Sequence, residues 1–268
     1  MAKQLLGKEV TAALNERIKG NVAALQEKGV NPTLCIIRVG ENPSDISYEK
    51  GATKKLTSFG LEVESKVFPG DISDEAFKKE FAAINADASV DGILMLRPLP
   101  KQINEQDIEK MIDPAKDLDG ISPVNIAKVF SGDTSGFAPC TAEAVVCMLK
   151  MNDIALSGKR VAVVGRSMVV GRPLSMLLLH ENATVTICHS RTASLPEVCR
   201  EADILTACVG KAAMINHTYV KKDAVVIDVG INVDENGKLC GDVDFADLEC
   251  GASAKISYSL HDLVKGQE

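Results

Sequence analysis

The sequence predicts an α/β fold built on parallel sheets. Short apolar runs with the length of buried strands alternate with longer segments of helical periodicity along most of the chain. Strands that are continuously apolar, rather than alternately apolar and polar, are typical of parallel sheets covered by helices. With 268 residues, 46% of them hydrophobic, the chain is long enough for one large or two modest domains.

The first half supplies three strand–helix alternations. An Asn42-Pro43-Ser44 turn opens one helix and Gly60 ends it, while Ser73 caps another whose first turn is acidic. Residues 101–140 are rich in turn residues and are predicted to be irregular. The predicted strands are Thr33–Val39, Leu61–Phe68 and Gly92–Leu96, and the predicted helices are Gly7–Gly29, Pro43–Phe59 and Ser73–Ala86.

The second half repeats the alternation after a helix at Ala142–Met151. A turn at Asp234-Glu235-Asn236-Gly237 predicts a hairpin between Ile231–Val233 and Lys238–Cys240. The predicted strands are Arg160–Val164, Thr184–His189, Ile204–Cys208 and Ala224–Asp228, and the predicted helices are Arg172–Glu181, Leu195–Glu201 and, more weakly, Asn216–Val220.

Composition excludes several classes of function. A net charge of −7 disfavours nucleic acid and anionic membranes as partners, although local basic residues can still bind a small anion. No apolar run approaches the roughly 20 residues that span a bilayer, and the charged N-terminal stretch has no signal-peptide core. The eight cysteines include no Cys-x-x-Cys pair, and His180, His217 and His261 show no ligand spacing. We therefore expect a cytoplasmic protein with reduced thiols, no metal, and no nucleic-acid or membrane partner.

The most informative segment is Val161 to Pro173, which reads VAVVGRSMVVGRP. A buried strand runs into Gly165, and Gly171 and Pro173 open the next helix. This strand–turn–helix arrangement suits phosphate binding at a helix N-terminus. Arg166 and Ser167 lie in the turn, where a guanidinium and a hydroxyl can meet phosphate oxygens. The glycine spacing differs from G-x-G-x-x-G, so an ordinary glycine turn is the alternative interpretation.

The end of the next strand indicates which nucleotide would bind. An NAD site usually carries Asp or Glu there for the ribose 2′-hydroxyl. This chain has Ser190 and Arg191 instead, and these would attract a 2′-phosphate. NADP is therefore the expected cofactor. His189, Lys211 and Asn232 lie near the same expected edge, but each is equally compatible with an ordinary structural role.

Several motifs together resemble the methylenetetrahydrofolate dehydrogenase/cyclohydrolase family. The resemblance runs from the N-terminus to about residue 254. The matching segments are Gly165-Arg166-Ser167 with Val170-Gly171-Arg172-Pro173, Asp91-Gly92-Ile93-Leu94 with Pro98-Leu99-Pro100, Lys116-Asp117-Leu118-Asp119-Gly120, Pro139-Cys140-Thr141, His189-Ser190-Arg191-Thr192, Asp228-Val229-Gly230 and Gly241-Asp242-Val243-Asp244-Phe245.

The resemblance implies two α/β domains with a cleft between them, the C-terminal one a Rossmann-like parallel sheet. It implies a folate-binding domain over residues 1–140, an NADP-binding domain over 141–254 and a homodimer. The implied reaction is oxidation of 5,10-methylenetetrahydrofolate to the methenyl cation, commonly followed by hydrolysis to 10-formyltetrahydrofolate. The implied cofactor residues are Gly165, Arg166, Ser167, Gly171, Pro173, Ser190, Arg191 and Ile231.

Two further residues are expected to handle the folate. By resemblance, Tyr48 stacks on the aminobenzoyl group and Asp119 binds the pterin. From the residues alone, Tyr48 could be an ordinary helix tyrosine, and Asp117 and Asp119 would be equal candidates in an Asp-Gly turn. The family pattern favours Asp119 as the ligand and Asp117 as the structural residue.

The chain departs from the family at two polar positions. Ala52 stands where the family has the lysine of Tyr-x-x-x-Lys, and Leu96 stands where it has a glutamine. Hydride transfer needs alignment more than an acid or base, whereas hydrolysis needs proton transfer. Lys55 is an outside candidate for the lost lysine, and Arg97 is another, although arginine is a poor base. We expect cyclohydrolase activity to be weak or absent.

The last departure is residues 255–268, where the family's glycine-rich loop and closing helix have no counterpart. The sequence predicts a divergent or truncated tail there. An alternative function is a catalytically reduced homologue that binds NADP without turnover.

Overall fold

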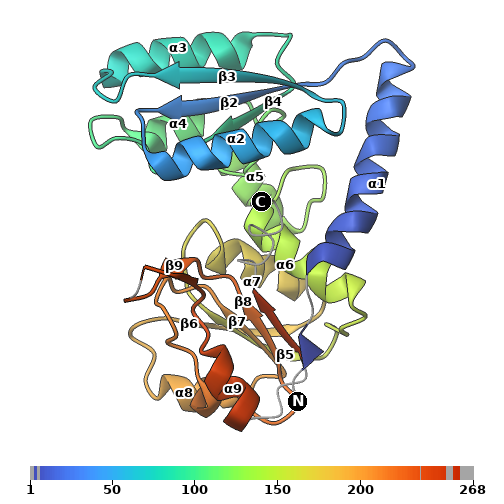
Figure 1. Cartoon of the computed structure of the whole chain (residues 1–268), viewed down its shortest axis with the longest axis vertical. Helices are drawn as coiled ribbons and strands as arrows, with labels where there is room; N and C mark the ends of the chain where they lie inside the picture. Colours follow the sequence, from blue (N-terminus) through green and yellow to red (C-terminus); the bar gives the residue numbers. More distant parts are fainter. Residues whose placement is uncertain (1–2, 5–6, 236, 252–255, 260–268) are drawn as a thin grey trace. The chain divides into compact units, whose positions relative to one another are not determined.

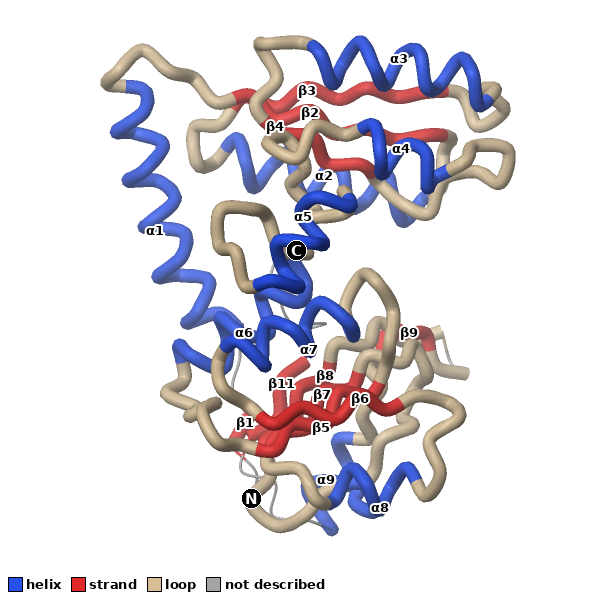
Figure 2. Tube along the Cα trace, turned by 180° about the vertical axis from the view of Figure 1, so that it is seen from behind, coloured by secondary structure: helices blue, strands red, loops and turns tan. Residues whose placement is uncertain are grey.

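The computed structural model describes residues 3–4, 7–235, 237–251 and 256–259. The chain forms two compact units, namely residues 12–140, called here the first unit, and residues 1–11 with 141–268, called the second unit. The division falls within α1 (Gly7–Gln26). Each unit holds its own parallel sheet with helices packed on it, which confirms the α/β prediction (Figures 1 and 2).

The first unit contains a three-stranded parallel sheet in the order β3-β2-β4. Six of the seven residues of the central strand β2 are buried, as its continuous apolar run predicts. The three strands are β2 (Thr33–Val39), β3 (Glu62–Phe68) and β4 (Gly92–Met95), each within one residue of its predicted bounds.

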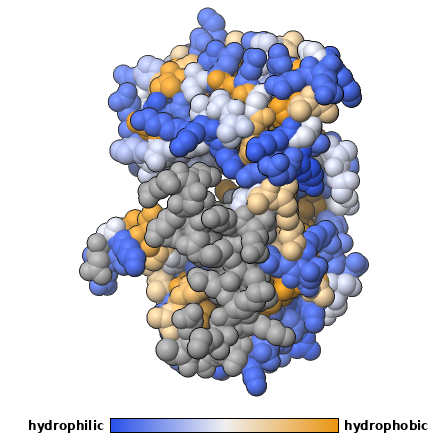
Figure 3. Space-filling view, turned by 45° about the vertical axis from the view of Figure 1, so that its right-hand side comes forward, coloured by the Kyte–Doolittle hydropathy of each residue, from blue (hydrophilic) through white to orange (hydrophobic). Residues whose placement is uncertain are grey.

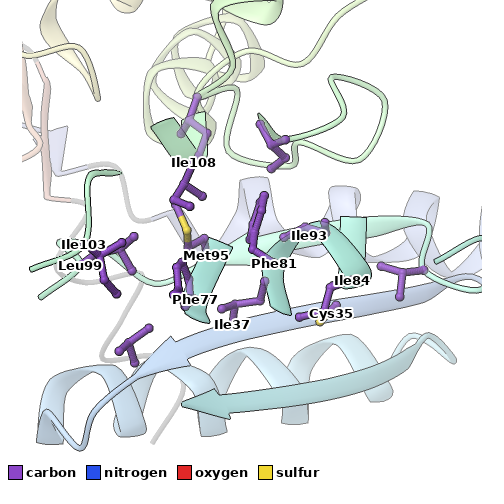
Figure 4. Packing of buried hydrophobic residues seen from close by; sticks show 14 residues of the cluster. Cys35, Ile37, Phe77, Phe81, Ile84, Ile93, Met95, Leu99, Ile103 and Ile108 are labelled. Carbon is purple, nitrogen blue, oxygen red and sulfur yellow. The ribbon is translucent and has the colours of Figure 1, made fainter. Parts of the chain in front are cut away.

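Helices cover both faces of this sheet, with α2 (Pro43–Thr57) and α3 (Asp74–Ala86) on opposite sides (Figure 1). Phe77 and Phe81 of α3 are fully buried against the sheet (Figure 4). The ring of Phe77 also meets that of Phe68 edge-on, with the ring centres 5.5 Å apart. By contrast, α2 has no fully buried residue. Its attachment therefore depends more on polar contacts.

The prediction that residues 101–140 are irregular is wrong. They contain α4 (Glu105–Met111) and α5 (Pro123–Ser131). The start and stop signals of α5 were present in the sequence, since Ser122 caps it, Pro123 occupies its first turn and Gly132 ends it in the left-handed conformation. The many turn residues around these short helices concealed them.

The second unit contains a six-stranded parallel sheet in the order β1-β11-β8-β7-β5-β6. Its strands β5 to β8 match the four predicted strands within one residue. The bounds are β1 (Lys3–Gln4), β5 (Arg160–Val164), β6 (Thr184–Cys188), β7 (Ile204–Ala207), β8 (Val225–Asp228) and β11 (Ile256–Ser259).

Alternate residues of these strands face different helices. One face, with Ala162, Leu205 and Val226, packs in the cluster that includes Cys199 and Leu248 of α8 (Leu195–Arg200) and α9 (Phe245–Gly251). Figure 2 shows α6 (Cys140–Met151) and α7 (Gly171–His180) on the opposite face. Burial of the interior strands β5, β7 and β8 on both faces explains their continuous apolar runs.

Several smaller elements differ from the expectation. The weak helix at 216–220 is a single 3₁₀ turn, η1 (His217–Tyr219), and the expected hairpin pairs β9 (Asn232–Val233) with β10 (Leu239–Cys240). The segment expected as a tail contributes β11, an interior strand between β1 and β8. Residues 252–255 and 260–268 lie outside the described residues.

The surface drawn in Figure 3 is mixed, with apolar residues scattered among hydrophilic ones outside the grey atoms. Among the described helices, none is long and apolar enough to cross a membrane.

A largely buried ion pair attaches α2 to the sheet. Nε of Arg38 on β2 lies 2.6 Å from Oε2 of Glu49 on α2, with side chains only 11% and 12% exposed. Burial opposes ionisation of Glu49, but hydrogen bonds from Ser65 and Arg38 lower its pKa. Arg38 also donates to the Gly40 carbonyl oxygen.

We predict that Glu49→Gln lowers the free energy of unfolding by about 3 kcal/mol, because it leaves the Arg38 charge buried without a counterion. Chemical denaturation followed by circular dichroism measures this. Glu16→Gln is the matched control, because its ion pair with Lys19 is exposed and should contribute nothing measurable. Equal stability of the two variants would contradict the prediction.

Candidate active site

The expected site residues of the first unit lie where its parallel strands end. Tyr48 follows β2 on α2, and Arg97 and Pro98 follow β4. Asp117 pairs with Ile93 of β4 through an isolated parallel bridge, which carries Asp119 along the same edge. The carboxyl edge of a parallel sheet is the usual place for a ligand in α/β folds.

Asp119 lies close enough to Tyr48 for its charge to affect the ionisation of the tyrosine hydroxyl. Tyr48 is 59% exposed, so its ring is available to a ligand. The pKa of its hydroxyl is raised, first by partial loss of hydration and then by the negative charges of Asp119 and Cys140. The arrangement presents an exposed aromatic ring beside a carboxylate.

The structure distinguishes the two aspartates of the Asp117–Asp119 turn. Asp117 is fully buried, and its oxygens accept from Ile121 N at 3.0 Å, Ser122 N at 2.8 Å and the Asn125 amide at 2.9 Å. Asp117 therefore holds the turn. Asp119 is half-buried, with a pKa raised by burial and by Asp117 against the opposing effects of Arg97 and a Cys140 hydrogen bond. Asp119 is accordingly the one suited to a ligand.

Sequence reasoning missed the carboxylates that hold Arg97. Nη1 of Arg97 lies 3.3 Å from a carboxylate oxygen of both Glu105 and Glu109 on α4. Glu105 also accepts from Leu99 N at 3.0 Å. The i, i+4 spacing of the two glutamates would have revealed them if α4 had been recognised. Arg97 is thus held beside Asp119 as a neutralised cation.

Ala52 and Leu96, which replace polar residues of the family, are both half-buried. The Lys55 side chain points away from Tyr48. The Lys55 ammonium lies 5.0 Å from the centre of the Phe59 ring, beyond the C-terminal end of α2. Lys55 is also about 10 Å further along the helix axis than Tyr48. The geometry therefore gives Lys55 no support as a replacement for the lysine missing at Ala52.

In the second unit, β5 and α7 meet in a close backbone contact. A Cβ at Gly171 would overlap the Gly165 carbonyl and lie 2.8 Å from Arg166 N, and Gly165 itself has φ +139°. Glycine is required at Gly171 because a side chain would separate the strand from the helix, and at Gly165 because of its positive φ and because a Cβ would meet Cys208. Gly171 and Pro173 are buried, so they shape this phosphate turn while Arg166 and Ser167 are exposed on it.

The start of α7 offers fewer free backbone donors than the sequence pattern suggests. Arg172 N already donates to Ser167 O at 3.0 Å, and Pro173 has no N–H. The Ser167 hydroxyl accepts from Val170 N at 3.1 Å, which leaves its own proton for an anion. The Arg166 guanidinium and the Ser167 hydroxyl are the exposed side-chain groups of the turn that could meet a phosphate.

The segment after β6 forms a compact turn with exposed Ser190 and Arg191. Thr192 N donates to His189 O at 2.8 Å, and His189 N donates to the Thr192 hydroxyl at 2.9 Å. Nδ1 of His189 accepts from Arg191 N at 3.1 Å. His189, which carried little weight in the sequence, thus fixes the backbone that bears the two expected 2′-phosphate residues.

Strand order brings two loops together at this edge. The chain passes from β5 to β6 on one side and then crosses to β7 on the other, so β5 and β7 flank the topological switch point. A Cβ at Gly165 would lie 2.6 Å from the Cys208 sulfur. Ile231, in the segment after β8, is 56% exposed, and Lys211, after β7, is also exposed. The expected cofactor residues therefore share one edge.

Within the described ranges, no group of three or more His, Cys, Asp or Glu side chains could hold a metal ion. The described cysteines are free thiols. Each unit thus has a candidate site of its own: an aromatic–carboxylate edge in the first unit and a nucleotide-type edge in the second.

This fold and edge define a nicotinamide-dinucleotide-binding class, and comparison with known proteins gives the family. Residues 5–119 match the catalytic domain of tetrahydrofolate dehydrogenase/cyclohydrolase, and residues 139–257 match its NAD(P)-binding domain. The chain belongs to this family. The expected recognition and the nicotinamide cofactor are confirmed.

Individual relatives and solved structures support the same family assignment. "Bifunctional protein FolD" of Carboxydothermus hydrogenoformans is 52% identical over 251 residues, covering 93% of this chain and 88% of that protein. The bifunctional FolD structure from Campylobacter jejuni superposes with a TM-score of 0.91 at 33% identity, covering 99% of both chains. The Trypanosoma brucei enzyme, solved with NADP and an inhibitor, gives 0.89 at 29% identity, covering 99% of this chain and 96% of that one.

Asp228, at the end of β8, gives a pH prediction. Burial raises the pKa of Asp228 to about 6. Hydrogen bonds from three backbone N–H groups act to lower this pKa, and the charge of Asp242 acts to raise it. The folded chain therefore keeps a proton that the unfolded chain releases between about pH 4 and pH 6. The free energy of unfolding should fall by about 3 kcal/mol as the pH rises through this window.

Denaturant unfolding of the wild type and of Asp228→Asn at several pH values measures this contribution. The difference between the two proteins should change across the window, because asparagine does not titrate. Parallel pH profiles would contradict the assignment.

Proposed function

We propose that this protein oxidises 5,10-methylenetetrahydrofolate to 5,10-methenyltetrahydrofolate with NADP in one-carbon metabolism, and that its cyclohydrolase activity is weak or absent. The proposal rests on the residues at the carboxyl edge of the sheet in the first unit. The exposed Tyr48 ring and the half-buried Asp119 lie together at one edge, while Ala52 and Leu96 stand in the two polar positions associated with hydrolysis.

The residues present suit hydride transfer. The folate nitrogens stabilise the cation that forms, so the protein must mainly hold the substrate in line. Tyr48 would stack on the aminobenzoyl ring, and Asp119 would pair with the pterin N–H groups. NADP, when bound, supplies the hydride acceptor.

The positive charge at the cofactor edge of the second unit supports NADP over NAD. Arg166, Ser190 and Arg191 are exposed there, and no acidic residue stands in the turn that would meet the 2′-position. The related Trypanosoma brucei enzyme was solved with NADP bound. A 2′-phosphate would therefore gain charge-assisted hydrogen bonds.

The residues that hydrolysis needs are missing from the carboxyl edge of the sheet in the first unit. Water attack on the methenyl carbon needs a proton acceptor with a suitable pKa. Ala52 has no such group, the Lys55 ammonium lies over Phe59, and the Arg97 guanidinium is held by two glutamates. Relatives bear bifunctional names, so this chain would depart from them in one of two activities.

A homodimer, a cytoplasmic location and the domain limits 1–140 and 141–254 remain our predictions. The alternative function is NADP binding without turnover. Formation of NADPH from methylenetetrahydrofolate separates the two, since cofactor binding without NADPH formation would establish the alternative.

We predict that Ala52→Lys combined with Leu96→Gln raises cyclohydrolase activity by about 10²- to 10⁴-fold, the usual value of general acid–base catalysis. Loss of the methenyl absorbance measures it. Ala52→Met with Leu96→Gln is the control, because it adds the length without the amine. A wild type that already hydrolyses at the rate of its bifunctional relatives would overturn the proposal.

We predict that Ser190→Asp lowers the preference for NADP over NAD by about 10- to 150-fold, the factor that corresponds to losing a hydrogen bond to a charged group. Initial rates with each cofactor measure the ratio. Ser157→Asp is the control, since Ser157 is exposed in the turn before β5. An unchanged ratio in Ser190→Asp would argue against a 2′-phosphate site at this turn.

A further inference from the structure

Two carboxylates that the proposed chemistry does not use are buried beneath the cofactor edge of the second unit. Asp228 ends β8 and is 1% exposed, and Asp242 follows β10 and is 0% exposed. A buried carboxylate is costly unless hydrogen bonds fill its lone pairs. Their contacts therefore show what they hold in place.

Asp228 fixes the backbone that carries Asp242. Its Oδ1 accepts from Asp242 N at 2.9 Å and from Gly230 N at 3.1 Å, and its Oδ2 accepts from Val243 N at 3.1 Å. Asp242 is also anchored through its own carbonyl oxygen, which accepts from Ile215 N at 2.9 Å.

Asp242 in turn holds the loop after β7. Its Oδ2 accepts from Val209 N at 2.6 Å and Gly210 N at 3.1 Å, and its Oδ1 accepts from Lys211 N at 2.8 Å. The Asn232 side chain on β9 donates to the same Oδ1 at 2.9 Å. Three successive backbone N–H groups thus converge on one carboxylate, which fixes the direction of the loop.

Two glycines make this contact possible. A Cβ at Gly230 would lie 2.7 Å from Asp242 N and overlap its carboxylate, and a Cβ at Gly241 would overlap the carboxylate of Asp228. The motifs Asp228-Val229-Gly230 and Gly241-Asp242 are therefore two halves of one buried arrangement.

The loop that Asp242 holds packs directly on the phosphate turn. Cys208, the residue before Val209, supplies the carbonyl and sulfur that a Cβ at Gly165 would meet. Cys208 N is itself bonded to Val164 O at 2.9 Å. A displacement of residues 209–211 would therefore reach Gly165 through a contact that has no spare room.

We propose that Asp242 is a positioning residue of the NADP site, which holds loop 209–211 against the phosphate turn and thereby sets cofactor affinity. This inference rests on the proposed cofactor function. It assigns a role in cofactor binding to a buried side chain that lies beneath the exposed residues of the edge.

The test is Asp242→Asn, which replaces one accepting oxygen with an amide that must face backbone donors. We expect its Kd for NADP, titrated with the folded protein, to rise at least tenfold over the wild type, while KM for methylenetetrahydrofolate changes less than twofold. A merely structural residue would lower stability without this split.

Asp203→Asn is the matched control. Asp203 is also a hydrogen-bonded carboxylate, accepting from Arg160 N at 2.9 Å and Lys221 Nζ at 2.7 Å, but it lies at the amino end of β7. It should lower the melting temperature and leave the Kd for NADP within twofold. A wild-type Kd in folded Asp242→Asn would overturn the inference, whereas failure of the wild type to bind NADP would instead overturn the proposed function.

Asn232→Ala removes a single donor to Asp242 and keeps the inference testable if Asp242→Asn does not fold. We expect a three- to tenfold rise in Kd for NADP. In the double variant with Asp242→Asn, the rise should not exceed that of Asp242→Asn alone, because both changes act through one carboxylate. A wild-type Kd in Asn232→Ala, or full additivity in the double variant, would count against the inference.

Discussion

The contact between the backbones of Gly165 and Gly171 is the constraint on which the second unit's binding edge depends. It joins the end of β5 to the start of α7 without room for a side chain. The same glycine, Gly165, presses on Cys208 after β7, so one residue links a strand, a helix and the neighbouring loop. This buried backbone arrangement fixes the backbone that carries the exposed side chains of the phosphate turn, and the Val170 N–H bond to the Ser167 hydroxyl adds a contact within the turn itself.

In the first unit, charged side chains rather than backbone contacts position the residues of the candidate site. Arg38 and Glu49 attach α2, which lacks a fully buried residue, and so position Tyr48. Both carboxylate oxygens of Asp117 accept backbone hydrogen bonds that stabilise the turn. Asp119 is half-buried and can therefore bind a ligand. In both units, a buried carboxylate holds a loop so that a neighbouring residue is free to meet a ligand.

Local signals in the sequence predicted much of the fold and only part of the site. Strands such as β2 and β5 were predictable because burial on both faces makes them continuously apolar. The two-residue β1 and the strand β11 were not, because neither is a continuously apolar run, and each is defined by its pairing, β1 with β11 and β11 with β8. Gly165 and Ser167 follow from a local pattern, whereas the pairing of Asp228 with Asp242 depends on folding that no local pattern reports.

The proposed loss of one activity and retention of another follows from what each step requires. Hydride transfer depends on alignment, which Tyr48, Asp119 and the phosphate turn can provide, while hydrolysis needs a proton acceptor that Ala52 and Leu96 do not offer. The most direct measurement is the product of a single reaction with methylenetetrahydrofolate and NADP⁺. The account predicts that methenyltetrahydrofolate accumulates in step with NADPH and then decays at the enzyme-free rate. Appearance of 10-formyltetrahydrofolate in step with NADPH would contradict it.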